Sequence, residues 1–171
     1  VSAIREALGL KETHILGQSW GGMLGMAYAL TQPDGVKSLT IASSPADMLQ
    51  WVSEANRLRQ LLPPLIQETL LQHELAGTTD SNAYQEATLE FYRRHVCRLD
   101  PWPDYINRTF DNIEQNPQVY HTMNGPSEFH VTGKLKEWTI VDRLGEIKLP
   151  TLITSGRYDE ATPLIAKTVH D

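Results

Sequence analysis

The sequence contains a single cysteine, Cys97, in 171 residues, which excludes an internal disulfide and metal sites built from cysteine pairs. It also lacks an excess of positive charge, because 15 Lys and Arg residues stand against 21 Asp and Glu residues and give a formal charge of −6. Nucleic acids and membrane surfaces are therefore not expected partners. No run of 18 apolar residues is present, and the opening residues do not have the form of a signal peptide. We expect a soluble, cytoplasmic protein with one ordinary domain's worth of chain.

The clearest motif is a serine between two glycines, Gly17-Gln18-Ser19-Trp20-Gly21, which matches the G-x-S-x-G nucleophile elbow. At such a sharp strand-to-helix turn the serine backbone is strained, and glycines two residues before and after it leave room for the crossing chain. The turn lifts the Ser19 hydroxyl clear of the sheet and leaves the Trp20 N–H free to bind an oxyanion. We therefore predict Ser19 as a nucleophile and Trp20 as a backbone donor of the oxyanion hole.

The residues around the motif have the context that an elbow needs. Residues 13–18 form a short apolar run typical of a buried parallel strand, and apolar residues then recur at helical spacing over 20–30. A Pro-Asp-Gly turn follows, and residues 36–44 indicate the next strand. This strand–turn–helix–strand order predicts an α/β fold with a parallel sheet flanked by helices.

A long helical stretch interrupts this pattern. The predicted helices cover residues 46–62, 65–76, 81–99 and 104–112, with no strand alternation among them. The sheet pattern returns with a buried strand over 149–156. We therefore predict three parts: 1–45 as the first part of an α/β-hydrolase core, 46–136 as a helical cap, and 137–171 as the second part of the core.

An acidic residue follows the last predicted strand. Asp159 lies in a loop after that strand, and Thr162 and Pro163 have the form of the N-cap and first residue of a final helix. In open α/β sheets the chemistry gathers at the carboxyl ends of the strands, where Ser19 also lies. The order of Ser19 and then Asp159 matches the triad order of α/β-hydrolases, in which the acid orients a histidine.

No histidine occupies the place of that base. The place follows the next helix and strand, about two dozen residues beyond Asp159, and the sequence stops at Asp171. His14 begins the elbow strand, His170 falls in the predicted last helix, and the other histidines lie in the helical stretch. The glycine-rich loop that supplies the second oxyanion donor is missing as well. We expect the base and this donor to lie outside the chain, which alone would be inactive.

Three segments resemble those of the proline iminopeptidases (prolyl aminopeptidases), including the branch of the tricorn-interacting aminopeptidase, and the likeness extends to amino acid amidases. The segments are Gly17-Gln18-Ser19-Trp20-Gly21-Gly22, Met123-Asn124-Gly125-Pro126-Ser127-Glu128-Phe129, and Pro150-Thr151-Leu152-Ile153-Thr154-Ser155-Gly156-Arg157-Tyr158-Asp159-Glu160. The resemblance covers essentially the whole chain and implies an α/β-hydrolase fold with a helical cap over the active site. It also implies that no metal or organic cofactor is needed.

The resemblance assigns further roles. It implies Ser19 as nucleophile, Asp159 as triad acid, and Glu128 and Glu160 as ligands of the substrate's free α-amino group. Carboxylates in a water-poor pocket bind an ammonium group through charge-assisted hydrogen bonds, which agrees with that assignment. Three aromatic residues are candidates for the wall of an apolar slot for the first side chain of the substrate: Tyr120, Trp102 and Trp138.

Three hypotheses about function are open at this point. The first is a serine aminopeptidase that releases an N-terminal residue, proline or another small apolar residue, through an acyl-enzyme. The second keeps the fold and changes the bond, as an amino acid amidase or an esterase. The third is a noncatalytic fragment without the triad histidine. Neither the preferred substrate residue nor the oligomeric state follows from the sequence.

Overall fold

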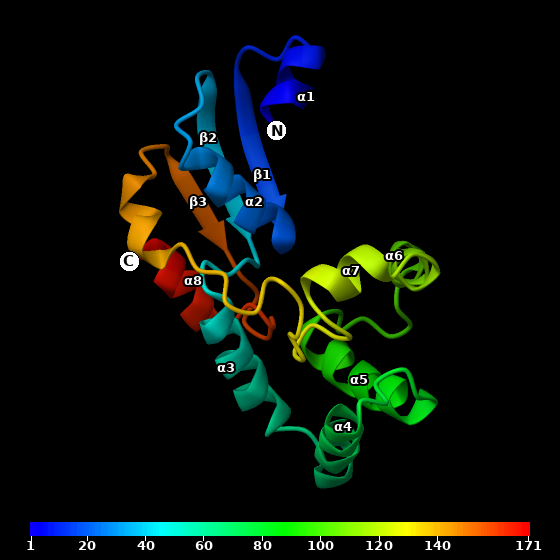
Figure 1. Ribbon diagram of the computed structural model, residues 1–171. Helices are drawn as coiled ribbons and strands as arrows, with labels where there is room; N and C mark the ends of the chain where they lie inside the picture. The colour runs from blue at the N-terminus through cyan, green and yellow to red at the C-terminus, as the bar shows by residue number, and fades with distance from the viewer. The chain divides into compact units, whose positions relative to one another are not determined.

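The computed structural model describes residues 1–171 (Figure 1). By their internal contacts, these residues form two compact units. The sheet unit comprises Val1–Gln50 and Thr139–Asp171, and the helical unit comprises Trp51–Trp138. Helix α3 (Met48–Arg59) begins in the first unit and ends in the second.

The sheet unit contains three parallel strands in the order β1-β2-β3, which confirms the predicted α/β class (Figure 1). The strands are β1 (Thr13–Gln18), β2 (Val36–Ala42) and β3 (Thr151–Thr154). The helical elements are α1 (Ser2–Ala7), α2 (Trp20–Ala29), the 3-10 helix η1 (Val141–Glu146) and α8 (Pro163–His170). Because α2 links β1 to the parallel strand β2, the turn between β1 and α2 lies at the carboxyl edge of the sheet.

Only one face of this sheet is covered. Leu39 and Ile41 of β2 point into a buried cluster with Met26 of α2 and Val169 of α8. On the opposite face, the register places Leu16 of β1 and Leu152 of β3 on either side of Thr40. The two leucines are 72% and 59% exposed. Parallel sheets are ordinarily covered on both faces, and the residues of this chain cover one of them.

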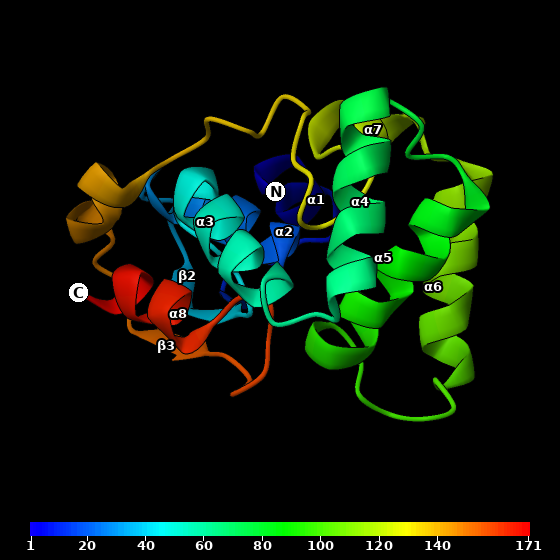
Figure 2. The ribbon, with the colours of Figure 1, turned by 90° about the horizontal axis from the view of Figure 1, so that it is seen from below.

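The helical unit contains no strand, as predicted for this stretch. It contains the end of α3 and four further helices, of which α4 and α5 lie side by side (Figure 2): α4 (Pro64–Ala76), α5 (Asn82–His95), α6 (Asp104–Gln115) and α7 (Gln118–Met123). Its own buried cluster includes Tyr84, Phe91 and Phe129. Helix α7 was not predicted from the sequence.

Local signals explain where several helices begin and end. The Ser81 hydroxyl accepts the Tyr84 N–H at the start of α5, and the Thr162 hydroxyl accepts the Ile165 N–H at the start of α8. Gly77 ends α4 in the left-handed conformation, with φ of 67°. The predictions of the Thr162 cap and of Pro163 as the first residue of α8 are confirmed.

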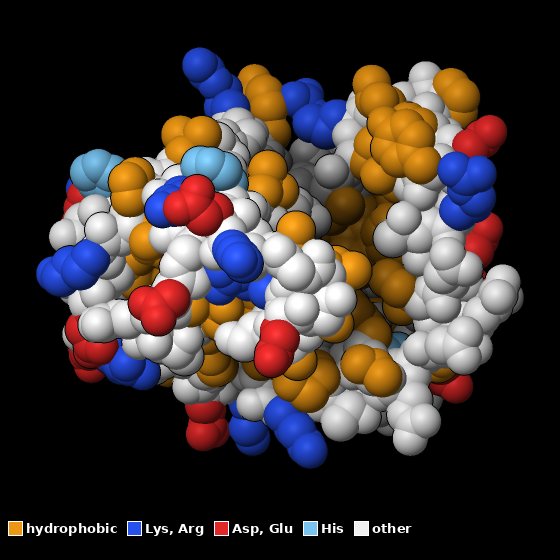
Figure 3. All heavy atoms as spheres, turned by 90° about the horizontal axis from the view of Figure 1, so that it is seen from above, with side chains coloured by type: hydrophobic (Ala, Val, Ile, Leu, Met, Phe, Trp, Pro, Cys, Tyr) orange, Lys and Arg blue, Asp and Glu red, His pale blue; other side chains and the backbone are white.

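The charge distribution on the surface and the lengths of the helices agree with the absence of an excess of positive charge and of long apolar runs in the sequence. No helix is both long and apolar enough to span a bilayer. Figure 3 shows basic side chains interspersed with acidic ones over the face that it presents, with no field of a single sign.

Candidate active site

The turn between β1 and α2 holds Ser19 in a strained conformation, as predicted. Its φ of 52° and ψ of −124° lie outside the backbone regions that residues other than glycine favour. Ser19 is half-buried at the carboxyl end of β1, and its N–H donates to the Ala42 carbonyl over 3.0 Å. Strain of this kind persists only where the surrounding structure enforces it, and it gathers at functional sites.

Two glycines, Gly17 and Gly22, allow the close approach of the chain at this turn. The sequence motif predicted Gly17 and Gly21 for this role. A Cβ atom on Gly17 would lie 2.1 Å from the Gly21 carbonyl oxygen, which no side chain tolerates. At Gly21 a Cβ atom would have nothing within 4 Å, so the prediction of a close approach there is wrong. The second close approach is at Gly22, where a Cβ would lie 2.5 Å from the Ser44 hydroxyl oxygen.

Trp20 is the first residue of α2, where a backbone N–H has no partner within the helix. Such an N–H is oriented along the helix axis and carries part of the positive end of the helix dipole. This is the position that an oxyanion donor requires, and the role of Trp20 stays a prediction.

Asp159 follows β3 and is held by three donors. The Ser43 hydroxyl donates to its Oδ2 over 2.6 Å, and the Gly156 N–H donates to the same oxygen over 3.2 Å. The Ala161 N–H donates to Oδ1 over 2.9 Å. A carboxylate held in this way by groups on two different elements has a fixed orientation, as a triad acid requires.

The two serines that follow β2 connect the elbow to the acid loop. The Ser44 hydroxyl donates to the Ser19 carbonyl oxygen over 2.6 Å, while Ser43 donates to Asp159 as described. The Ser43 N–H also donates to the Thr154 carbonyl, so hydrogen bonding between β2 and β3 continues past the ends of both strands. Neither serine was predicted from the sequence as a site residue. The signal available was their position, immediately after the strand that lies between the elbow strand and the acid strand.

No histidine of the chain contacts this site. The partners of Asp159 are the three donors above, and His14 instead contacts the Ser38 hydroxyl through Nδ1 at 2.7 Å. His170 is exposed and contacts the neighbouring Asp171. No group of three His, Cys, Asp or Glu side chains is arranged to bind a metal ion. Ser19 and Asp159 therefore lie at one edge of the sheet without a base beside them.

Glu128 lies in the helical unit, in the loop after α7, and is fixed through both its backbone and its side chain. The Tyr120 hydroxyl donates to Glu128 Oε1 over 2.8 Å. The Glu128 N–H donates to the Tyr92 hydroxyl over 3.1 Å, and its carbonyl accepts the Trp51 indole N–H over 2.7 Å. Burial raises the pKa of the Glu128 carboxyl, and the hydrogen bond from Tyr120 opposes that rise.

A network of polar contacts holds Ser127 and Phe129, the two residues next to Glu128 in the sequence. The Arg59 guanidinium pairs with Glu74 at 2.9 Å, and the Tyr84 hydroxyl lies 3.2 Å from the other oxygen of Glu74. Tyr84 is also 3.1 Å from the hydroxyl of Ser127, the residue before Glu128. Arg59 further stacks over the Phe129 ring, 4.7 Å from its centroid. The residues on both sides of Glu128 are thus anchored in the core of the helical unit.

The other predicted site residues divide between the two units. Glu160 is half-buried beside Asp159 in the sheet unit. Trp138 is the last residue of the helical unit and is half-buried, with its N–H donating to the Leu135 carbonyl. The structure brings Tyr120 together with Glu128, and it brings Ser19 and Asp159 to one edge of the sheet. The assigned roles of all these residues stay predictions.

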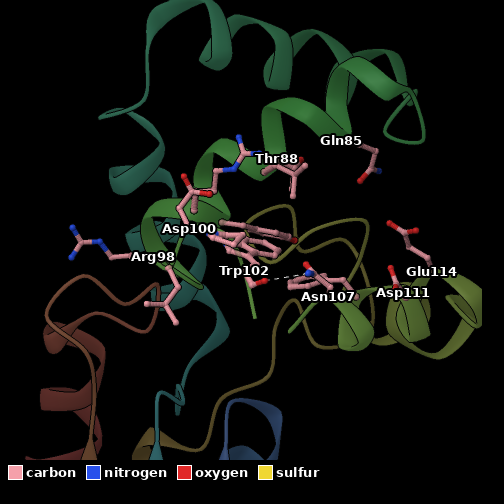
Figure 4. Close-up of a pocket in the computed structure, with 14 residues that line it drawn as sticks. Gln85, Thr88, Arg98, Asp100, Trp102, Asn107, Asp111 and Glu114 are labelled. Atoms are coloured by element: carbon pink, nitrogen blue, oxygen red, sulfur yellow. Dashed lines mark hydrogen bonds between the residues drawn. The ribbon is translucent and has the colours of Figure 1, made fainter. Parts of the chain in front are cut away.

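Two pockets of different size lie within the helical unit. One, of about 860 Å³, lies around Trp102, with Arg98 and Asp100 on one side and Asp111 and Glu114 of α6 on the other (Figure 4). The other, of about 610 Å³, is lined by Tyr120, with the loop residues Gly125 and Pro126. Trp102 and Tyr120 therefore line different pockets, and Trp138 lines neither.

Known proteins resemble this chain over almost its full length. The model of the alpha/beta hydrolase fold family matches residues 1–169. A proline iminopeptidase of Heyndrickxia coagulans is 42% identical over 95% of this chain and 56% of its own length. One of Thermoplasma volcanium is 34% identical over 97% of this chain and 56% of its own length.

Solved structures resemble the chain equally well. The crystal structure of VinJ, at 48% identity, has a TM-score of 0.97 and covers 99% of this chain and 58% of its own. The crystal structure of proline iminopeptidase from Mycobacterium smegmatis, at 47% identity, has a TM-score of 0.89 and covers 99% of this chain and 57% of its own. The chain thus spans a little more than half the length of these relatives, and the resemblance predicted from three segments is confirmed. The chain belongs to the alpha/beta hydrolase fold family.

Proposed function

We propose that the full-length protein containing this chain is a serine hydrolase of the proline iminopeptidase type, which releases proline from the N-terminus of peptides. The proposal is carried by one observation at the carboxyl edge of the sheet. There the strained Ser19 follows β1, the carboxylate of Asp159 follows β3, and the neighbouring residues Ser43 and Ser44 hydrogen-bond to Asp159 and Ser19 respectively. The substrate rests on the relatives named proline iminopeptidase, which are 34–42% identical to this chain. The proposed cytoplasmic location rests on composition alone.

In the proposed reaction, the Ser19 oxygen attacks the carbonyl carbon of the substrate's first residue, and a histidine base accepts the hydroxyl proton. The Trp20 N–H stabilises the oxyanion of the tetrahedral intermediate. The same histidine gives its proton to the departing amine, which leaves as the shortened peptide. Water then hydrolyses the acyl-enzyme, frees the amino acid and restores the Ser19 hydroxyl. Asp159 orients the histidine and stabilises its protonated form.

Recognition of the free N-terminus falls to Glu128 and Glu160. An aminopeptidase has to distinguish a cationic amino group from an internal peptide bond, and carboxylates that bind the ammonium group do so by charge-assisted hydrogen bonds. Glu128 suits this role because Tyr120 and the backbone contacts hold it in place before substrate binds.

Activity of the full-length protein toward a prolyl anilide, a prolyl amide, short peptides and simple esters tests the proposal. We expect Ser19→Ala to lower kcat by about a millionfold and Asp159→Asn by about 10,000-fold, with folding retained. Ser38→Ala is the matched control, because it removes a hydroxyl from the other end of β2. Turnover by Ser19→Ala at the wild-type rate would end the proposal, and a preference for esters over prolyl substrates would replace it with an esterase.

The recognition roles need a separate measurement. We expect Glu128→Gln to lower kcat/KM for a free prolyl substrate by about 10- to 100-fold, because a charge-assisted hydrogen bond is replaced by a neutral one. The N-acetylated substrate should be affected much less. Glu160→Gln is measured in the same way. If both variants discriminate the free from the N-acetylated substrate as well as the wild type does, neither glutamate binds the amino group.

A further inference from the structure

Ser43 makes the shortest contact to Asp159. Its hydroxyl oxygen lies 2.6 Å from Oδ2, within the range of a charge-assisted O–H···O⁻ hydrogen bond. The two other donors to Asp159, Gly156 and Ala161, are backbone groups of the same loop and move with it. Ser43 is therefore the one side chain that fixes the carboxylate relative to a different strand.

The arrangement leaves one acceptor position on Asp159. A carboxylate offers about two lone-pair sites on each oxygen. Oδ2 is filled by Ser43 and Gly156, whereas Oδ1 receives only the Ala161 N–H. If the hydrogen bond from Ser43 is removed, each of the two oxygens accepts one backbone N–H. The carboxylate then has no contact that fixes which oxygen takes which position.

The backbone at Ser43, like that at the elbow, has a positive φ. Its φ is 49°, and that of Ser19 is 52°, so two of the three residues other than glycine with positive φ follow β1 and β2 at one edge. Left-handed backbone of this kind is unfavourable for a serine and persists only where its surroundings hold it. At Ser43 the holding contacts are the N–H bond to Thr154 and the hydroxyl bond to Asp159.

We propose that Ser43 is a positioning residue for catalysis, which turns the Asp159 carboxylate so that the remaining lone pair of Oδ1 receives the ring N–H of the catalytic histidine. This inference rests on the proposed function, because it requires Asp159 to act as the triad acid. Ser43 touches neither the substrate nor the reacting atoms and acts only through Asp159. Ser44, its neighbour, has a different task, since it holds the Ser19 carbonyl and thereby the elbow.

The test measures kcat and KM of the full-length protein on a prolyl anilide for Ser43→Ala and Ser43→Gly, with Ser38→Ala as control. We expect kcat to fall roughly 10- to 100-fold in both Ser43 variants, with KM changed less than about twofold. Glycine accepts positive φ without strain, so Ser43→Gly removes the hydroxyl while favouring the observed backbone. Recovery of wild-type kcat in Ser43→Gly would mean that the backbone matters and the hydroxyl does not, which would overturn the inference.

A double variant separates action through Asp159 from an independent effect. In the Asp159→Asn background, Ser43→Ala should lower kcat by less than about twofold further, since the partner of the hydroxyl has already been changed. The same loss in both backgrounds would overturn the inference. If Ser19→Ala and Asp159→Asn lower kcat as expected while Ser43→Ala keeps the wild-type kcat, only this inference fails. If Ser19→Ala retains turnover, the proposed function itself fails.

Discussion

The helical unit closes a hydrophobic core of its own, whereas the sheet unit covers only one face of its sheet. Tyr84, Phe91 and Phe129 are wholly buried among residues of one continuous stretch. The sheet unit is assembled from two separate stretches, and its open face carries Leu16 and Leu152. The two units thus differ in how their cores are assembled: that of the helical unit comes from one continuous stretch, and that of the sheet unit from two.

The largest expected effect comes from breaking the closed core. Phe91 packs against the Phe129 ring at 4.9 Å between centroids, so Phe91→Ala should lower the free energy of unfolding by about 3–5 kcal/mol. Leu152→Ala, on the open face, should change it by less than about 0.5 kcal/mol. Urea unfolding of the 171-residue chain measures both. Similar losses for the two variants would show that the open face is covered in solution, for example by a second copy of the chain.

The second test concerns the ion pair inside the helical unit. Arg59 and Glu74 have side chains only 14% and 8% exposed, so Arg59→Met removes the arginine from a buried carboxylate. Because the Tyr84 hydroxyl and His130 Nδ1 still contact that carboxylate, the loss should be at most about 3 kcal/mol. Arg93→Met is the control, because the Arg93–Glu90 pair is much more exposed and contributes at most about 1 kcal/mol. Amide hydrogen exchange should show that the loss for Arg59→Met is concentrated in α4 and α5. A loss of protection from exchange that is equally large in β1 and β2 would contradict the separation of the two units.

The smallest expected effect is a gain in stability with a defined pH dependence. Burial raises the folded-state pKa of Glu128, so the ionised carboxylate opposes folding, and wild-type stability falls as pH rises from the unfolded pKa, about 4.3, through the folded one. Glu128→Gln removes this dependence and keeps an oxygen that accepts the Tyr120 hydroxyl. The variant should therefore have the higher Tm at pH 8 and the same Tm as the wild type at pH 4. A Tm difference that does not change between these pH values would show that ionisation of Glu128 does not oppose folding.

Local patterns were sufficient to predict most of the elements. The apolar run before Ser19 and the Thr162 cap are signals within a few residues of the strand and the helix that they predict. Helix α7 was not predicted because its six residues, Gln118–Met123, are too short for a helical period to be recognised. The cover on a single face of the sheet also has no local signal, since it depends on which elements pack together.

The candidate site was predictable only in part. Ser19, Asp159 and Glu128 lie in segments that resemble those of a known family. Ser43 and Ser44 were missed because two serines after a strand are ordinary loop residues until the register of β2 between its neighbours is known. Their function in the structure comes from contacts across 116 and 25 positions of sequence, to Asp159 and Ser19 respectively.

The contact between Gly22 and Ser44 has a consequence for how the elbow tolerates mutation. Positions 17 and 22 should accept only glycine in a saturation mutagenesis library, whereas position 21 has space for an alanine. The one expected exception at position 22 is Gly22→Ala combined with Ser44→Gly, because a Cβ atom at 22 would also lie 2.6 Å from the Ser44 Cβ. The five-letter elbow signature therefore records one glycine that this chain does not need for space and omits one that it does.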